Sequence, residues 1–258
     1  MPDCIKEQDC SLGEKFFQFN KQIVDATEDI AACYKLQIAC YEALGLDGLQ
    51  AFAKTLQYIR GKGGIAISDV KRGDISSTAS QYAKGHFTGD FASDFMTINA
   101  YMGEDAVSPY YDYLKAGKGM FILVKTSNPS GVELQDAKLQ SGETVYERMG
   151  ALVSKWNAAF VGEGRFGAIG AVAGLTYPAQ FAALRPYMPN TFFLIPGYGA
   201  QGGTGKDIAE IFKEGKCGVV NSSRGIIAAH RGKTEGEDYV EYVRRAAIAM
   251  NEDINQWL

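Results

Sequence analysis

The chain alternates between short runs of aliphatic and β-branched residues and longer segments in which apolar residues recur at helical spacing. In one such segment, Leu49, Phe52, Leu56 and Ile59 form a stripe with the 3.6-residue period of an amphipathic helix. Such helices need a sheet to cover, and the repeated order of strand and helix predicts parallel strands joined by helical crossovers. The predicted strands are residues 31–35, 65–71, 95–99, 120–125, 168–172, 192–195 and 218–221.

A helix predicted over residues 14–29 precedes the first of these strands, with Phe16, Phe19 and Ile23 on one side. Residues 1–13 are polar and turn-like, so this helix has no predicted strand before it. Seven strands behind a leading helix predict a (β/α)8 barrel that lacks its first strand, although an open doubly wound sheet would also accommodate seven strands. No linker rich in Pro, Gly or Ser interrupts the alternation, so residues 1–258 are expected to form one domain.

Composition and charge limit which partners and which cellular compartment are expected for the protein. The net charge of −4 and the pI near 5.4 argue against nucleic acid as a partner, although a local phosphate pocket needs only a few donors. No apolar run is long enough to span a bilayer, and the acidic N-terminal region does not resemble a secretory signal, so the cytoplasm is the expected compartment. The five cysteines show no C-x-x-C spacing, which predicts reduced thiols and no zinc site.

The second predicted strand changes from apolar to charged along one face. Ile67, Asp69 and Lys71 fall on that face because side chains alternate along a strand, and the carboxyl end of a barrel strand opens into the active site. Asp74 lies in the loop just beyond, and Lys35, which ends the preceding predicted strand, is expected beside Asp69. Taken alone, a lysine snorkelling at a strand end or a partly exposed salt bridge would explain these residues without catalysis.

Longer motifs favour the catalytic interpretation. In chain order these motifs are Y-K-L-Q-I-A-C-Y-E, D-V-K-R-G-D-I-S-S-T, T-I-N-A-Y-M-G-E-D, K-T-S-N-P-S, I-P-G-Y-G-A-Q-G-G and N-S-S-R-G-I. With them the sequence resembles orotidine 5′-monophosphate decarboxylases, in particular the bacterial subgroup with D-A-K-R-G-D-I-G, from about Phe16 to about Ala229. This resemblance implies a TIM (β/α)8 barrel that decarboxylates orotidine 5′-monophosphate (OMP) to UMP in pyrimidine biosynthesis, without a cofactor or a metal.

The resemblance also implies roles for the charged residues. Lys71 would be the proton donor, Asp69 would lie near the departing carboxylate, and Lys35 would orient the ribose. Opposite charges at close range favour the ionised forms, so Lys71 is expected to be cationic between Asp69 and Asp74. Asp74 and Thr78 would cross the interface of a homodimer into the neighbouring subunit's site. Considered singly, Thr78 is also a common type of residue at a helix start.

Two loops are expected to bind the phosphate of the nucleotide. Loops after the last two strands of such barrels often do so, because glycine-rich backbone and a following helix present N–H groups. By resemblance, Gln201 and Arg224 bind the phosphate with their side chains, the backbone around Ser223 adds a donor, and Pro196 begins the first loop. Ser127 would contact the pyrimidine ring. A single glycine-rich loop, or a serine before Asn-Pro, would otherwise be explained by turn geometry.

One family feature is missing from the sequence. Members begin with a strand that ends in L-D-x-D, and no such segment occurs here. The opening residues MPDCIKEQ resemble the stretch that follows that strand, so Met1 is expected to be an internal methionine or the start of a truncated chain. The chain is expected to be less stable and less active than one with the strand restored.

Two other functions are compatible with the same residues. Metal-dependent sugar-phosphate lyases of the same barrel group also carry D-x-K-x-x-D, and a dependence on Mg²⁺ would identify them. A non-catalytic nucleotide-binding barrel would bind UMP without turnover. His86 and His230 form no nucleophilic triad with an evident serine, and we expect both to have packing roles.

Overall fold

Seven parallel strands form one sheet that curls into a nearly closed barrel. The computed structural model describes residues 1–175, 178–199, 202–213 and 215–258. The strands pair in the order in which they occur in the sequence, and this confirms the predicted α/β barrel. Their bounds are β1 Tyr34–Gln37, β2 Ala66–Arg72, β3 Phe95–Ile98, β4 Gly119–Lys125, β5 Ile169–Ala173, β6 Phe193–Pro196 and β7 Gly218–Asn221.

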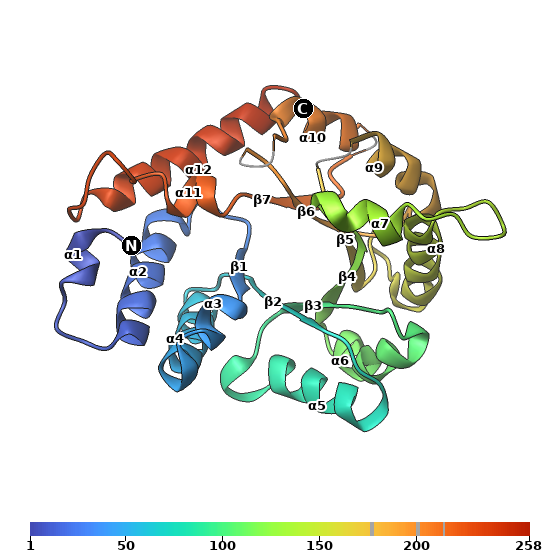
Figure 1. Ribbon diagram of the computed structural model, residues 1–258, viewed down its shortest axis with the longest axis horizontal. Coiled ribbons are helices and arrows are strands. Elements are labelled where there is room, and N and C mark those ends of the chain that lie inside the picture. The colour runs from blue at the N-terminus through green and yellow to red at the C-terminus, as the bar shows by residue number, and fades with distance from the viewer. Residues whose placement is uncertain (176–177, 200–201, 214) are drawn as a thin grey trace.

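Helices surround the sheet as an outer ring, which is seen end-on in Figure 1. α2 begins after Ser11, whose hydroxyl accepts a hydrogen bond from the Glu14 amide as an N-cap. α8 begins with a capping box between Thr144 and Glu147. The helices are α1 Asp3–Lys6, α2 Leu12–Thr27, α3 Ala39–Glu42, α4 Gly45–Gly61, α5 Ser76–Phe87, α6 Tyr111–Lys115, α7 Val132–Gln135, α8 Val145–Asn157, α9 Pro178–Leu184, α10 Gly205–Ile211, α11 Arg224–Ile227 and α12 Tyr239–Asn255.

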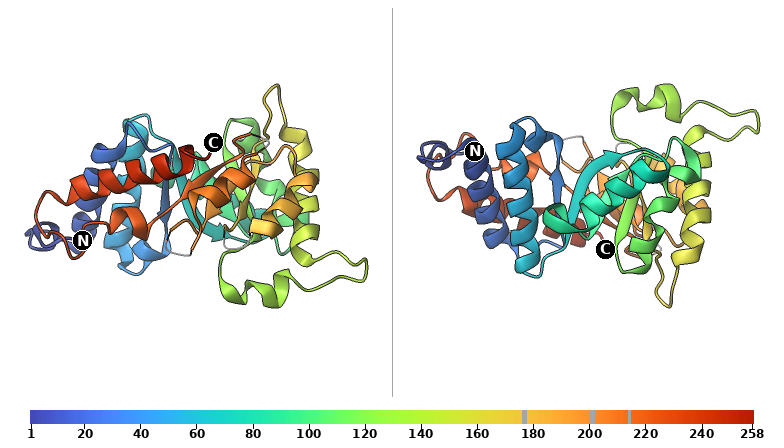
Figure 2. Two further views of the ribbon diagram at one scale, coloured as in Figure 1. Left: turned by 90° about the horizontal axis from the view of Figure 1, so that it is seen from above. Right: turned by 90° about the horizontal axis from the view of Figure 1, so that it is seen from below.

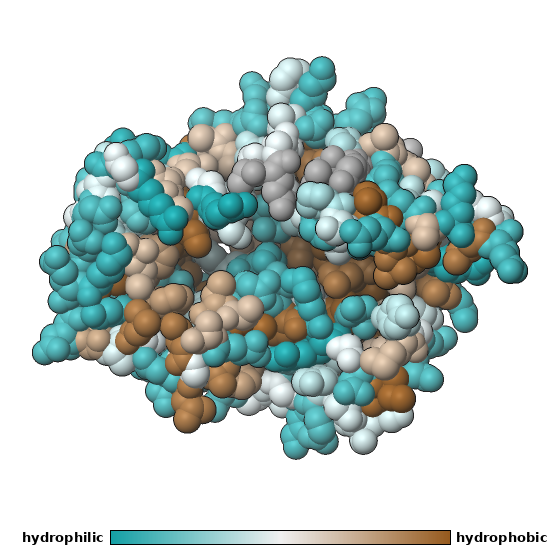
Figure 3. All heavy atoms as spheres, viewed as in Figure 1, coloured by the Kyte–Doolittle hydropathy of each residue, from teal (hydrophilic) through white to brown (hydrophobic). Residues whose placement is uncertain are grey.

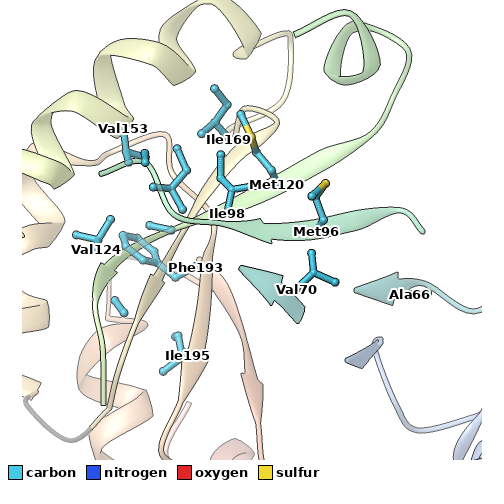
Figure 4. Close-up of a cluster of buried hydrophobic side chains, with 14 of the residues drawn as sticks. Ala66, Val70, Met96, Ile98, Met120, Val124, Val153, Ile169, Phe193 and Ile195 are labelled. Carbon is cyan, nitrogen blue, oxygen red and sulfur yellow. The ribbon is translucent and has the colours of Figure 1, made fainter. Parts of the chain in front are cut away.

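The main core lies between the outer face of the sheet and the helices. Figure 4 shows side chains of this layer, including Met96, Ile98 and Phe193, packed closely around the strands. A smaller apolar cluster fills the barrel interior and consists of Ile67, Phe121, Val172 and Leu194. Both faces of the parallel strands are therefore buried, as their aliphatic composition predicts.

The barrel has one seam. Among the described residues β1 and β7 do not pair with each other, so each presents one edge without a strand neighbour. On the outside, α2 and α12 lie side by side across this seam (Figure 1). Their contact includes the stacked rings of Phe19 and Tyr239, 5.5 Å apart, and Arg244 donates two hydrogen bonds to Asp29 at 2.6 and 2.7 Å. The helical layer is therefore continuous where the sheet is open.

The structure corrects the predicted elements near the N-terminus. The first strand, predicted at 31–35, is Tyr34–Gln37, because pairing with β2 starts at the hydrogen bond from the Tyr34 amide to the Ile65 carbonyl. Lys35 is therefore the second residue of its strand and not the last. The segment expected to be only turn-like contains α1, whose Ile5 is buried against α2 and α12. The other six strands agree with their predicted bounds to within one residue at each end.

Two features bear on the environment of the chain. Within the described ranges, no helix is both long and apolar enough to cross a membrane. All five cysteines are free thiols.

Candidate active site

A cavity of about 230 Å³ opens at the carboxyl ends of the strands. Figure 3 shows this face hollowed near its centre, with hydrophilic side chains gathered there. The lining residues are Lys35, Asp69, Lys71, Thr97, Leu123, Thr126, Ser127, Asn128, Val172, Leu194, Pro196 and Asn221. A larger depression of about 570 Å³ lies outside the barrel, lined by residues of α2 and α4, away from the strand ends. We therefore place the site at the barrel mouth, where five of the predicted residues meet.

Asp69 is the centre of a charge network. Lys35 Nζ donates to Asp69 Oδ2 at 2.6 Å, and Lys71 Nζ donates to Asp69 Oδ1 at 2.5 Å. Gln37 Nε2 also donates to Oδ2, at 3.2 Å. Burial by itself would raise the pKa of Asp69, but the charge of Lys35 and the hydrogen bonds from both lysines outweigh it, so the pKa lies below its usual value. Asp69 is thus a carboxylate at neutral pH that binds two ammonium groups.

Strand register explains how Lys35 reaches Asp69. In the parallel pair β1–β2, Lys35 lies opposite Ile67 and Gln37 lies opposite Asp69. Side chains two residues apart share a face, so Lys35 and Gln37 both point into the barrel and the longer lysine extends up to the carboxylate. The predicted proximity of Lys35 and Asp69 is therefore confirmed, although Lys35 is not at the strand end.

The backbone at Lys71 is irregular. Lys71 has φ of 45°, a left-handed conformation that is uncommon for residues with a side chain, and the pairing of β2 with β3 shifts register between Ser68 and Arg72. The amides of Val70 and Lys71 donate to the hydroxyl of Thr97 at 3.0 and 2.9 Å instead of to a β3 carbonyl. The amine of Lys71, with 45% of its side chain exposed, thus reaches both Asp69 and the cavity.

Asp74 and Thr78 lie outside this cavity. Asp74 Oδ1 accepts a hydrogen bond from the Ile75 amide, and Thr78 is exposed in the first turn of α5. Within one chain, then, the structure does not bring Asp74 to Lys71 in the way that it brings Asp69.

The loops predicted to bind phosphate begin side by side. Pro196 ends β6 and pairs with Asn221, the last residue of β7, so the segments that follow both strands leave the same part of the barrel rim. Arg224 begins α11 and is exposed, and its carbonyl accepts a hydrogen bond from the Ala228 amide within that helix. Ser223 precedes it and is also exposed. Gln201, the other predicted phosphate residue, lies outside the described residues.

Comparison with known proteins places this geometry in a family. The family model for "Orotidine 5'-phosphate decarboxylase / HUMPS family" matches residues 17–239. The chain belongs to this family. A curated orotidine 5′-phosphate decarboxylase of Clostridium acetobutylicum is 48% identical over 250 residues, which cover 96% of the chain and 87% of that relative. One from Clostridium tetani is 46% identical, with 99% and 89% covered.

Solved structures agree with this membership. The OMP decarboxylase of Leishmania donovani superposes with a TM-score of 0.78 at 25% identity and covers 100% of this chain and 98% of its own. The UMP synthase of the same organism gives a TM-score of 0.80 at 28% identity, with 97% of this chain and 52% of that protein covered. The barrel is therefore the fold of the decarboxylase family.

Sequence reasoning missed several polar residues of the cavity. Gln37 and Thr97 both contact Asp69, and Asn128 and Asn221 line the cavity wall. Gln37 could have been found, because it lies two residues beyond Lys35 on the same strand face. Thr97 gave no such signal, because its role depends on a register shift between two strands that strand periodicity does not reveal.

The acidic residues of the site do not form a metal-ligand cluster in the described part of the chain. The described residues include no group of three or more His, Cys, Asp or Glu side chains placed to hold a metal ion. The oxygens of Asp69 instead bind lysine and glutamine side chains and the Thr97 hydroxyl.

Proposed function

We propose that the chain, acting as one decarboxylase domain over residues 1–258, converts OMP to UMP and CO2. The observation that carries this proposal is the buried Asp69 carboxylate bound by two lysine amines beside a partly apolar cavity. The chain's family, and relatives that carry the name of this enzyme, support the same reaction.

Lys71 supplies the proton in this mechanism. Loss of CO2 breaks the bond between C6 of the pyrimidine and the carboxylate carbon, and the electron pair stays at C6. The ammonium of Lys71 stabilises this developing anion and transfers a proton to C6, which completes UMP. Its exposed surface allows the neutral amine to recover a proton from solvent.

Asp69 and Lys35 hold Lys71 in the required position. Asp69 binds the Lys71 amine and directs it into the cavity, close to the position of the departing carboxylate. Lys35 occupies the second oxygen of Asp69 and orients the ribose. Leu123 and Val172 make the adjacent cavity wall apolar, so the charges act in a region with little water.

The remaining predicted residues bind the nucleotide. Arg224 binds the phosphate with two parallel hydrogen bonds, with Gln201 and the backbone around Ser223 adding donors. Ser127 contacts the pyrimidine, and Pro196 forms the rim between ring and phosphate. No metal or organic cofactor has a role in this reaction scheme. The free thiols fit a cytoplasmic protein of pyrimidine biosynthesis, because reducing compartments keep cysteines as thiols.

The protein acts as a homodimer in this proposal, with Asp74 and Thr78 of each subunit completing the partner's site. A mixing experiment tests this arrangement. Lys71→Ala and Asp74→Ala chains, each inactive alone, should regain up to about a quarter of the parent activity when co-refolded, because some mixed dimers contain one intact site. Activity that stays at the level of the separate variants would contradict a shared site.

Turnover of OMP tests the activity itself. The purified chain should form UMP and CO2 from OMP with equal rates in EDTA and in Mg²⁺, and Arg224→Ala should raise KM at least tenfold. A rate that requires Mg²⁺ would indicate a metal-dependent lyase. UMP binding without turnover would indicate a nucleotide-binding barrel.

A further inference from the structure

We propose that Thr97 is a positioning residue that fixes Asp69 and Lys71 for decarboxylation, an inference that rests on the proposed function. Thr97 lies in β3, next to β2, and its side chain is 1% exposed. It contacts the carboxylate of Asp69 and the backbone of the two residues that follow. A single hydroxyl thus connects the carboxylate of Asp69 to the backbone of Lys71.

The hydrogen-bonding capacity of this hydroxyl is fully used. A threonine hydroxyl can accept two hydrogen bonds and donate one. The amides of Val70 and Lys71 can only donate, so they occupy both acceptor sites of Thr97 Oγ1. The one remaining proton points to Asp69 Oδ1, 3.0 Å away. Since all three bonds have a determined direction, the hydroxyl defines the position of the carboxylate oxygen that also binds the Lys71 amine.

The same hydroxyl stabilises the irregular backbone of β2. A left-handed conformation is unfavourable for a residue with a side chain, and amides shielded from water lose further free energy when they have no acceptor. Thr97 supplies the acceptor for both amides at the register shift, and regular pairing resumes where the Asn99 amide donates to the Arg72 carbonyl at 2.7 Å. The bulge that aims Lys71 into the cavity is therefore held by a side chain of the neighbouring strand.

Removal of the hydroxyl should act on chemistry more than on binding. Asp69 would lose one of its donors, and the Lys71 backbone would lose the acceptor that fixes its conformation. The amine would then sample positions away from the reacting carbon, and small displacements of this kind lower the rate strongly. Arg224, for which we propose the phosphate contacts, lies in α11 after β7, and its contacts would not change.

Three variants of Thr97 test the inference. Thr97→Val keeps the shape of the side chain and removes the hydroxyl, whereas Thr97→Ser keeps the hydroxyl. The matched control is Thr55→Val, because Thr55 is also a buried threonine, 2% exposed, whose hydroxyl donates to the Ala51 carbonyl within α4, outside the site. Thr97→Ala provides a second hydroxyl-free variant with less steric demand. Circular dichroism selects conditions in which every variant is folded, and kcat, KM and their pH profiles are then measured with OMP.

The expected result is a loss of kcat by about 10- to 100-fold in Thr97→Val and Thr97→Ala, with KM within about threefold of the parent value. Thr97→Ser and Thr55→Val should keep kcat within about threefold. The acidic limb of the kcat profile should move to higher pH in Thr97→Val, because Asp69 has lost a donor that favours its charged form. A folded Thr97→Val with unchanged kcat would overturn the inference alone. A parent chain that forms no UMP would overturn the proposed function together with it.

Discussion

At the scale of single residues, a neutral histidine, His86, contacts the end of the strand that carries Asp69 and Lys71. Arg72 follows Lys71, and its Nε donates a hydrogen bond to Nε2 of His86 at 3.2 Å. A histidine nitrogen that accepts from arginine must lack a proton. Burial, and then the charge of Arg72, lower the pKa of His86 to about 4. His86 therefore has a structural role, in keeping with the packing role predicted for it.

This histidine should make stability depend on pH. The pKa of His86 is about 6.5 in the unfolded chain and about 4 in the folded chain. Between these two pH values the unfolded chain binds more protons than the folded chain, so the free energy of unfolding decreases as the pH falls. The contribution of His86 to the free energy of unfolding should drop by roughly 2 kcal/mol from pH 7 to pH 5. Urea unfolding of the parent chain and of His86→Gln at both pH values measures this difference. An identical pH dependence in the two proteins would contradict the assignment.

Sequence could predict the ion pairs of the site but not what fixes their geometry. Asp69 and Lys71 lie two residues apart on one strand, so their shared face follows from strand periodicity alone. The left-handed Lys71 and the Thr97 hydroxyl depend on how two strands slip against each other, which is a property of the folded sheet. The positions of Asp74 and Thr78 outside the cavity likewise follow from the loop and helix after β2.

At the scale of elements, the excursion between β4 and α8 forms one wall of the site. α7 and the segment that follows it project beyond the helical ring (Figure 2). Two consecutive residues attach this excursion to the end of β4. Gln135 bonds with both the amide and the hydroxyl of Thr126 at 3.0 and 2.7 Å, and Asp136 accepts from the Lys125 amine at 2.5 Å. Thr126 and Ser127 line the cavity, so this clamp sets the position of that wall.

Breaking the clamp should weaken substrate binding. Lys125 is 2% exposed, and Asp136→Asn would replace the carboxylate that binds its ammonium with a neutral amide. We expect KM for OMP to rise about tenfold with kcat changed less, because the turn at Ser127, which we propose contacts the pyrimidine, loses its support. Glu143→Gln is the matched control, since Glu143 lies in the same excursion and pairs with Arg148 at the surface. Equal KM values for the two variants would show that the clamp does not position the wall.

The positions of strands and helices were predictable where the apolar periodicity is strong. They were less predictable where tertiary contacts determine the bounds of an element. β4, β5 and β6 are aliphatic and almost wholly buried, and their predicted bounds agree with the structure to within one residue. β1 was misplaced because 31–33 are as apolar as the true strand, and only pairing with β2 distinguishes them. α1 has only four residues, which is too short for the sequence to show a helical pattern. The contacts of Ile5 with α2 and α12 stabilise this helix.

At the scale of the whole molecule, the seam between β1 and β7 is the feature least like a closed barrel. Every residue of β7 is only partly buried, whereas all of β5 is buried. The open edges have backbone groups available for another strand. A parallel strand inserted between them would complete the sheet and cover the partly exposed residues of β7.

Adding such a strand should stabilise the protein. A variant extended before Met1 by a segment of alternating apolar residues, long enough to lie between β7 and β1, should raise Tm by roughly 5 °C or more, because newly buried apolar surface adds a few kcal/mol. It should also have higher turnover, since the rim that carries Lys35 becomes more rigid. The control extension has the same composition with a central proline, which cannot pair as an inner strand. Equal Tm values for the two extensions would indicate that the seam does not accept a strand.

In the proposed mechanism Lys71, held by Asp69, protonates the pyrimidine carbon, and single-turnover decarboxylation of OMP by Lys71→Ala measures the contribution of this amine. Lys118→Ala is the control, because Lys118 also pairs with an aspartate, Asp94, but immediately before β4, at the opposite end of the barrel. We expect that Lys71→Ala remains folded, still binds UMP, and decarboxylates OMP about 1,000-fold more slowly or not at all, while Lys118→Ala keeps the parent rate. A Lys71→Ala rate within tenfold of the parent would contradict this mechanism.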